Sequence, residues 1–226
     1  MLLMPGFDGT GELFSPLTAA LPPRYRPTVI RYSAERTFDD HVDTLSAALP
    51  EQGAILVAES FSGPIALGLM ARHPERLQCA VLCATFVESP FHTLTKLARF
   101  VPSPLFGLHL GQRAMLRQFC LDDRCDPTLM NQALTVVESM PAAAVAARLN
   151  VLAELRVREL CRNIRTPILI LRPTGDRLVS PSRYKQLIEA LPGAIVRDIE
   201  GPHLLLQSRP QECAQLIDEF VSATIP

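Results

Sequence analysis

The sequence of 226 residues has no long apolar segment, no excess of either charge and no basic stretch before an apolar N-terminus. No apolar run approaches the roughly 20 residues of a membrane-spanning helix. A net charge of −1 provides no overall field for nucleic acid or acidic lipid. Met1–Met4 is followed at once by Pro5, which leaves too short an apolar stretch for a signal peptide. These absences predict a cytoplasmic protein without a membrane span and without nucleic acid as a partner.

The six cysteines show no metal-binding spacing. Cys79 and Cys83 share an apolar run, where free cysteine behaves as a small hydrophobic residue. Cys120 and Cys125 match no zinc pattern, because their spacing is wrong and no second pair of ligands follows. Reduced thiols are the default in a chain of this size without a signal peptide. We therefore expect neither a metal site nor a regulatory disulfide.

Short apolar runs alternate with amphipathic helical patterns along most of the chain. Strands that are apolar on both faces and alternate with helices form a mostly parallel sheet with helices on both faces. The sequence therefore predicts an α/β fold. The expected strands are Met1–Met4, Thr28–Tyr32, Ile55–Ala58, Cys79–Ala84, Pro167–Arg172 and Ala194–Ile199.

One segment interrupts this alternation. From about Glu88 to Arg165, helical patterns and proline-rich joints replace strands. An insertion after the fourth strand lies over the strand ends, where open α/β sheets bind ligands. We expect residues 1–87 and 166–226 to form the core and residues 88–165 to form a helical lid. The following apolar residues are expected mainly to form the lid's own small core: Phe91, Leu94, Leu97, Phe100, Phe106, Leu108, Leu110, Met115, Leu116 and Phe119.

A serine stands where the third expected strand meets an apolar helix. Ile55–Ala58 leads into Ser60 and then into the helical run. A serine on such a strand-to-helix turn is lifted above the sheet, beside the N-terminus of the new helix. The usual pattern is G-x-S-x-G, but Ala58 and Ser62 replace both glycines and Gly63 comes one place late. By itself this pentapeptide fits a catalytic nucleophile and an ordinary helix N-cap equally well.

Two further residues supply what a serine nucleophile requires. A serine hydroxyl reacts poorly until a histidine, held by a carboxylate, accepts its proton. Of the five histidines, only His203 lies in a short loop between the last expected strand and the last helix, and Asp176 directly follows the preceding strand. Taken singly, His203 and Asp176 also fit ordinary loop residues without a catalytic role. Because all three residues follow parallel strands in the order serine, acid, histidine, we predict Ser60, Asp176 and His203 as a catalytic triad.

The glycine-rich loop Pro5–Gly11 follows the first expected strand. An acyl-transfer site needs N–H donors for its oxyanion, one from the residue after the nucleophile and one from this loop. We predict Phe61 and Phe7 as these donors. A dinucleotide site is disfavoured, because the glycines run G-x-x-G-x-G instead of G-x-G-x-x-G, and a P-loop is excluded by the lack of Gly-Lys-Ser/Thr.

These motifs together resemble the α/β-hydrolase fold superfamily, in particular small lid-bearing serine esterases and acyl hydrolases. The resemblance covers nearly the whole chain and is carried by PGFDGTG, AESFSG, ARHPERL, GDRLV and GPHL. It implies an α/β-hydrolase fold and the same roles for the five predicted site residues. Pro5 stands where the family often has histidine. The chain also starts on the family's third strand and lacks the usual N-terminal hairpin, so we expect a truncated start or a partner at a bare sheet edge.

The expected reaction is hydrolysis of a carboxylic ester or thioester with an apolar acyl group, through an acyl-enzyme and without a cofactor. An acyltransferase would use the same residues, and a non-catalytic binding protein of this fold would not need all three members of the triad. Fold alone does not decide among these. Five arginines near the end of the lid fit either a solvated face or a landing patch for an acidic acyl carrier protein: Arg148, Arg156, Arg158, Arg162 and Arg165.

Overall fold

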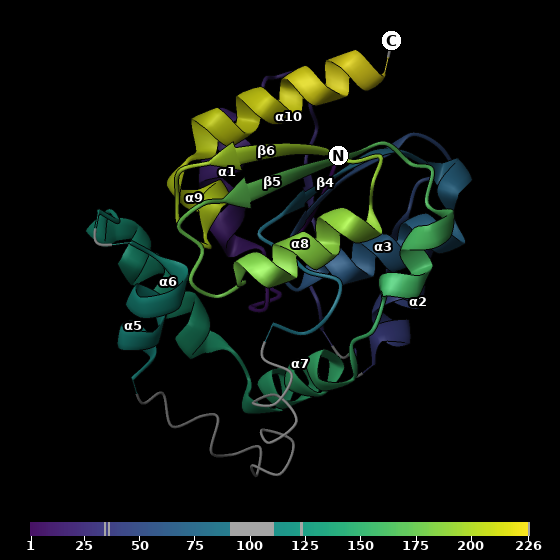
Figure 1. Ribbon diagram of the computed structural model, residues 1–226. Coiled ribbons are helices and arrows are strands. Elements are labelled where there is room, and N and C mark those ends of the chain that lie inside the picture. Colours follow the sequence, from purple (N-terminus) through teal and green to yellow (C-terminus); the bar gives the residue numbers. More distant parts are fainter. Residues whose placement is uncertain (34, 36, 91–110, 123, 226) are drawn as a thin grey trace.

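The computed structural model describes residues 1–33, 35, 37–90, 111–122 and 124–225, and its centre is a six-stranded parallel sheet (Figure 1). The strand order is β2-β1-β3-β4-β5-β6. The strands are β1 (Leu2–Met4), β2 (Thr28–Val29), β3 (Ala54–Glu59), β4 (Leu77–Cys83), β5 (Ile168–Pro173) and β6 (Ile195–Ile199). The direction of winding reverses between β1 and β3, and ligands of open α/β sheets bind at such a point. The predicted parallel α/β sheet is thus confirmed.

Helices cover both faces of the sheet. On one face lie α2 (Phe38–Ala48), α3 (Ser62–Arg72) and α8 (Pro181–Ala190), and on the other lie α1 (Ser15–Ala20), α9 (Leu205–Ser208) and α10 (Pro210–Thr224), as Figure 1 shows. Alternate residues of β3 enter the two cores, with Leu56 in one and Val57 in the other. The sheet is therefore buried on both faces, as the apolar strand runs indicate.

Local sequence accounts for several helix boundaries. Thr37 and Asp40 form a capping box at the start of α2, and each side chain accepts a hydrogen bond from the other's backbone N–H. Proline occupies the first turn of α8 and of α10, where its missing N–H has no helical partner to lose. At the sheet edge, the strand expected over Thr28–Tyr32 is shorter, because only Thr28 and Val29 pair with β1 and both are exposed.

The chain between β4 and β5 contains only helices in its described part, apart from one isolated bridge between Glu88 and Arg156. These helices are α5 (Gln112–Met115), η4 (Leu116–Cys120), α6 (Pro127–Ser139), α7 (Ala142–Glu154) and η5 (Arg158–Asn163). In Figure 1 the arrowheads of β5 and β6 point toward the side on which α6 lies. The limits of this insertion, 88 and 165, stay a prediction.

The insertion contributes to a small hydrophobic core. It contains Leu116, Leu121, Met130 and Val136 of the insertion together with Leu13 from the sheet part of the chain. Of the ten apolar residues expected there, the seven from Phe91 to Leu110 lie outside the described residues. Leu116 is buried as expected. Met115 and Phe119 are exposed, so their inclusion in this core was wrong.

Within the residues that the structure describes, no single helix is long and apolar enough to cross a membrane. The helices α6 and α7 reach the length and composition of a span only as a pair, and this pair is bent by 94°.

Candidate active site

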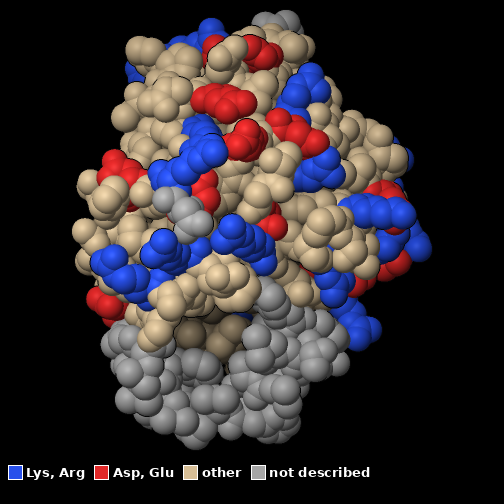
Figure 2. Space-filling model, turned by 60° about the vertical axis from the view of Figure 1, so that its left-hand side comes forward, with Lys and Arg blue, Asp and Glu red and all other residues tan. Residues whose placement is uncertain are grey.

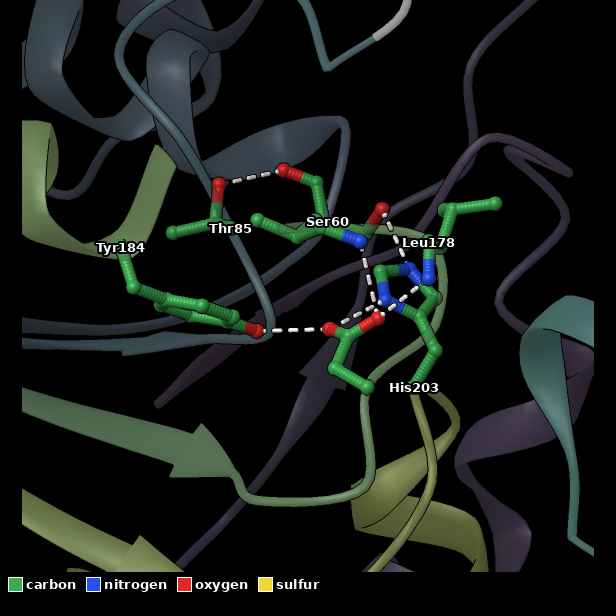
Figure 3. A network of polar contacts seen from close by, with 7 residues as sticks. Ser60, Thr85, Leu178, Tyr184 and His203 are labelled. Carbon is green, nitrogen blue, oxygen red and sulfur yellow. Dashed lines mark hydrogen bonds and ion pairs between the residues drawn. The ribbon is translucent and has the colours of Figure 1, made fainter. Parts of the chain in front are cut away.

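Ser60, Asp176 and His203 meet beyond the C-terminal ends of β3, β5 and β6 (Figure 3). Nε2 of His203 lies 2.9 Å from Oγ of Ser60, and its Nδ1 lies 2.8 Å from Oδ2 of Asp176. The side chains of His203 and Asp176 are only 4% and 1% exposed. Three residues far apart in the sequence therefore form one hydrogen-bonded chain in a site largely shielded from solvent.

The turn that carries Ser60 is strained and held from several sides. Ser60 has a φ of 50°, in the left-handed region that residues with a Cβ avoid. Its N–H donates to the carbonyl of Cys83 at 2.9 Å, and its carbonyl accepts from the Thr85 hydroxyl at 2.6 Å and from the Gly63 N–H at 3.0 Å. These bonds fix the strand-to-helix turn that lifts the serine above the sheet.

The small residues around the turn have separate tasks. A Cβ on Gly63 would lie 2.0 Å from Oγ1 of Thr85, so the steric demand for glycine falls on this residue. Ser62 is fully buried, and its hydroxyl donates to the carbonyl of Pro5 and contacts the Tyr32 hydroxyl at 2.5 Å. The sequence indicated only that Ser62 is small, and this bond to the glycine-rich loop had no local signal.

Four groups hold the Asp176 carboxylate. Oδ1 accepts the backbone N–H groups of Leu178 and Val179, at 2.8 and 2.9 Å, and Oδ2 accepts the Tyr184 hydroxyl at 2.6 Å besides bonding His203. Burial by itself raises the pKa of Asp176, but the charge of His203 and these hydrogen bonds together lower it. The carboxyl is therefore ionised at neutral pH. Tyr184 was not among the residues predicted for the site.

Phe7 and Phe61, the predicted oxyanion donors, lie on two segments that flank Ser60. Phe61 directly follows Ser60, and a Cβ on Gly6 would be 3.9 Å from the Cβ of Ser60, which places the loop after β1 against Ser60. The two phenyl rings make an edge contact with centroids 6.0 Å apart. In the described part of the chain, neither backbone N–H has a hydrogen-bond partner.

Glu59 is a buried carboxyl beside Ser60 that sequence reasoning did not single out. Its Oε2 accepts the Gln207 side-chain amide at 3.1 Å, whereas its Oε1 has no partner among the described residues. Burial raises its pKa to about 7, against smaller opposing effects of Gln207 and His203. The Glu59 carboxyl therefore changes its protonation state close to neutral pH.

The five arginines near the end of the insertion do not form one surface. Arg148 is buried and bonds backbone carbonyls, so placing it in a landing patch was wrong. The other four are exposed, and Arg156 and Arg158 line a groove of about 370 Å³ with Arg183, Glu88 and Glu159. On the face shown in Figure 2, charges of both signs are interspersed.

Among the described residues, no group of three or more histidine, cysteine, aspartate or glutamate side chains is arranged to hold a metal ion. All six cysteines are free thiols.

Comparison with known proteins gives consistent relatives. The sequence model of the family described as serine aminopeptidase, S33, matches residues 34–202. A pimeloyl-[acyl-carrier protein] methyl ester esterase of Aromatoleum aromaticum is 28% identical over 244 aligned residues, which cover 98% of this chain and 97% of that protein.

Solved structures share the fold over almost the whole chain. An enol-lactonase from Burkholderia xenovorans superposes with a TM-score of 0.82 at 19% identity, covering 98% of this chain and 90% of that one. A thermophilic esterase from Thermogutta terrifontis gives a TM-score of 0.80 at 20% identity, covering 100% and 90%. The predicted α/β-hydrolase fold is confirmed.

Proposed function

We propose that this chain, which belongs to the serine aminopeptidase S33 family of the α/β-hydrolase superfamily, hydrolyses carboxylic esters with Ser60 as its nucleophile. The observation that carries the proposal is the buried chain of hydrogen bonds from Ser60 through His203 to Asp176. Serine, imidazole and carboxylate in this order are the groups that acyl transfer through a covalent intermediate requires.

In the acylation half of the reaction, Nε2 of His203 accepts the proton of the Ser60 hydroxyl as Oγ attacks the carbonyl carbon of the ester. The carbonyl oxygen becomes an oxyanion, to which the backbone N–H groups of Phe61 and Phe7 donate. The imidazolium of His203 then protonates the leaving alkoxide. The alcohol departs and the acyl group stays on Ser60.

In the deacylation half, His203 removes a proton from water, which attacks the acyl-enzyme through a second oxyanion. Collapse of this intermediate releases the carboxylic acid, and His203 returns the proton to Ser60. The ionised Asp176 holds Nδ1–H of His203 and stabilises the imidazolium in both halves. The bonds from Tyr184 and from the backbone keep this carboxylate oriented.

The experiment that tests the proposal compares hydrolysis of p-nitrophenyl esters, from acetyl to palmitoyl, by the wild type, Ser60→Ala and Asp176→Asn. We expect Ser60→Ala to lower kcat by roughly 10⁶-fold. Asp176→Asn should lower it by roughly 10⁴-fold, because the imidazole takes the wrong tautomer. Ser46→Ala is the control, since this hydroxyl bonds the Val42 carbonyl within its own helix. Equal rates in the wild type and Ser60→Ala would contradict the proposal, and the preferred chain length tests the expected apolar acyl group.

As the specific substrate, we propose the methyl ester of an acyl chain that is attached to an acyl carrier protein. Support comes from the relative of that activity, which aligns with 98% of this chain. The exposed Arg156 and Arg158 beside the groove offer positive charge to an acidic carrier, although Arg158 also lies 3.5 Å from Glu189. Such rim charges act mainly on association and lose strength with salt.

The double variant Arg156→Glu/Arg158→Glu tests the carrier proposal. We expect KM for the carrier-bound methyl ester to rise at least about tenfold, because rim charges steer association, while hydrolysis of p-nitrophenyl butyrate stays unchanged. Unchanged turnover of the carrier-bound ester would refute the carrier proposal and leave the esterase proposal intact.

A further inference from the structure

Every carbonyl of the loop Pro5–Gly9, which carries the Phe7 N–H, is engaged. The donors are the Ser62 hydroxyl to Pro5, the Gly9 N–H to Gly6 at 3.1 Å, Arg148 to Phe7 and Asp8 at 2.9 and 2.6 Å, and the Tyr32 N–H to Gly9 at 2.9 Å. The loop is therefore fixed on its carbonyl side, while the Phe7 N–H stays free in the described part of the structure.

Arg148 is the member of this set that comes from the helical insertion. It lies on α7 and is 5% exposed, and one nitrogen of its guanidinium, Nη1, donates to both carbonyls. Among the described residues no carboxylate lies within ion-pair distance of it. The Asp8 side chain instead accepts the N–H and hydroxyl of Thr10, at 2.8 and 2.6 Å. A buried cation without a carboxylate partner is costly, so these carbonyl bonds must compensate for its lost hydration.

The loop is shaped to receive this guanidinium. Gly9 has a φ of 69°, and a Cβ there would lie 2.3 Å from Nη2 of Arg148. On another side, the guanidinium carbon lies 5.9 Å from the centre of the Tyr32 ring. The hydroxyl of that tyrosine contacts Ser62 at the start of α3. Arg148 therefore sits at the junction of the insertion, the glycine-rich loop and the nucleophile turn.

We propose that Arg148 is a positioning residue that holds the Phe7 N–H in place for the oxyanion from the helical insertion. This inference rests on the proposed esterase function and adds to it. The Gly9 N–H fixes the peptide that contains the Phe7 N–H, and Arg148 fixes the next two peptides, so the donor is held from its C-terminal side. Packing of α7 against the loop thereby becomes a condition for catalysis.

The kinetic test uses Arg148→Met and Arg148→Lys with p-nitrophenyl butyrate. Loss of a well-placed oxyanion donor lowers kcat by roughly 10²–10³-fold in other enzymes, so a displaced donor should lower it by roughly 10–100-fold. We expect KM to stay within about twofold, because the oxyanion exists only in the transition state. Arg148→Lys, which keeps a charged donor, should lose less. The control is Arg113→Met, the same change at an exposed insertion arginine that bonds Asn131 of α6.

Two further readouts separate positioning from loss of structure. Binding of a trifluoromethyl ketone, which forms an oxyanion on the serine, should weaken by the same factor as kcat/KM, whereas binding of the product acid should not change. Amide hydrogen exchange in residues 5–10 should speed up in Arg148→Met and not in Arg113→Met, with the thermal midpoint nearly unchanged.

The outcomes distinguish this inference from the proposed function. Wild-type kcat and loop exchange in Arg148→Met, or a rise in KM at constant kcat, would overturn the role of Arg148 and leave the esterase intact. A wild type without Ser60-dependent turnover would overturn the esterase, and loop exchange would then decide by itself whether Arg148 holds the loop. If Arg148→Met does not fold, Arg148→Lys decides on the same criteria.

Discussion

Glu59 and His41 are buried near Ser60, and burial moves their pKa values in opposite directions. The pKa of Glu59 is raised from 4.5 to about 7, and that of His41 is lowered from 6.5 to about 4. Neither ring nitrogen of His41 has a partner among the described residues, and its ring packs edge-on against Tyr32 and Phe61. Both side chains are therefore more easily kept neutral in the folded protein than in the unfolded chain.

The two groups should tilt the pH dependence of stability in opposite senses. Folded Glu59 binds its proton more tightly than unfolded Glu59, so protonated Glu59 stabilises the folded protein. This contribution to the free energy of unfolding, about 3 kcal/mol, is fully present below about pH 4.5 and is lost as the pH rises through about 7. Folded His41 resists protonation, so its contribution is present above pH 6.5 and lost as pH falls through about 4. Between pH 4.5 and 6.5 the two slopes largely cancel.

Single variants should reveal these slopes in urea unfolding between pH 4.5 and 6.5. Relative to wild type, Glu59→Gln leaves the His41 slope uncompensated, so its free energy of unfolding should increase more with pH. His41→Phe should show the opposite trend. The same pH dependence in all three proteins would contradict the assignment of raised and lowered pKa values.

At Gly63, near the start of α3, the side chain of Thr85 leaves no room for a Cβ. Gly63 faces Thr85, whose hydroxyl also bonds the carbonyl of Ser60. A side chain at Gly63 would therefore displace the Thr85 hydroxyl that bonds Ser60. The glycine that the turn between β3 and α3 requires therefore stands one position later than in the usual G-x-S-x-G pattern.

Gly63→Ala should destabilise the protein and impair catalysis together. Overpacking of this kind costs about 1–3 kcal/mol, and displacement of Ser60 should lower kcat at least roughly tenfold. Gly193→Ala is the matched control, since its added Cβ meets nothing within 4 Å. Its free energy of unfolding should stay within about 1 kcal/mol of wild type. Similar behaviour of the two variants in urea unfolding and ester hydrolysis would refute this account.

Across the whole molecule, the solvent accessibility of the free thiols indicates how tightly the two cores are packed against the sheet. Cys79, Cys83, Cys161 and Cys213 are buried, and burial raises the pKa of each. The remaining two thiols, in the insertion, are only partly buried. Since the thiolate is the reactive form, the four core thiols should be inert in the native state.

A thiol titration with Ellman's reagent should therefore modify at most Cys120 and Cys125 in the native protein and all six cysteines in 6 M guanidinium chloride. Cys125 should react first, because burial raises the pKa of Cys120 to about 12. Cys120→Ser and Cys125→Ser variants identify the reacting thiols. Rapid native reaction of more than two would mean that the core opens readily.

Contacts between distant segments were decided only by tertiary structure. Gln207 bonds Glu59 from 148 residues away, and Arg148 bonds Phe7 from 141 residues away. The density of arginines near the end of the insertion suggested either a solvated face or a landing patch for Arg148, since nothing local distinguishes it from its exposed neighbours. Its burial follows from how α7 packs on the glycine-rich loop, which depends on the whole insertion.

The sequence by itself determined the sheet and the meeting of Ser60, Asp176 and His203. Alternating strand and helix patterns require parallel strands, and the loops after parallel strands share one edge, so chain order alone brought these residues to the same place. The local pattern of apolar residues was enough to predict the strands and helices, because their periodicity can be recognised within a few residues. The groups that hold the glycine-rich loop and the Asp176 carboxylate come from packing between elements, which periodicity does not encode.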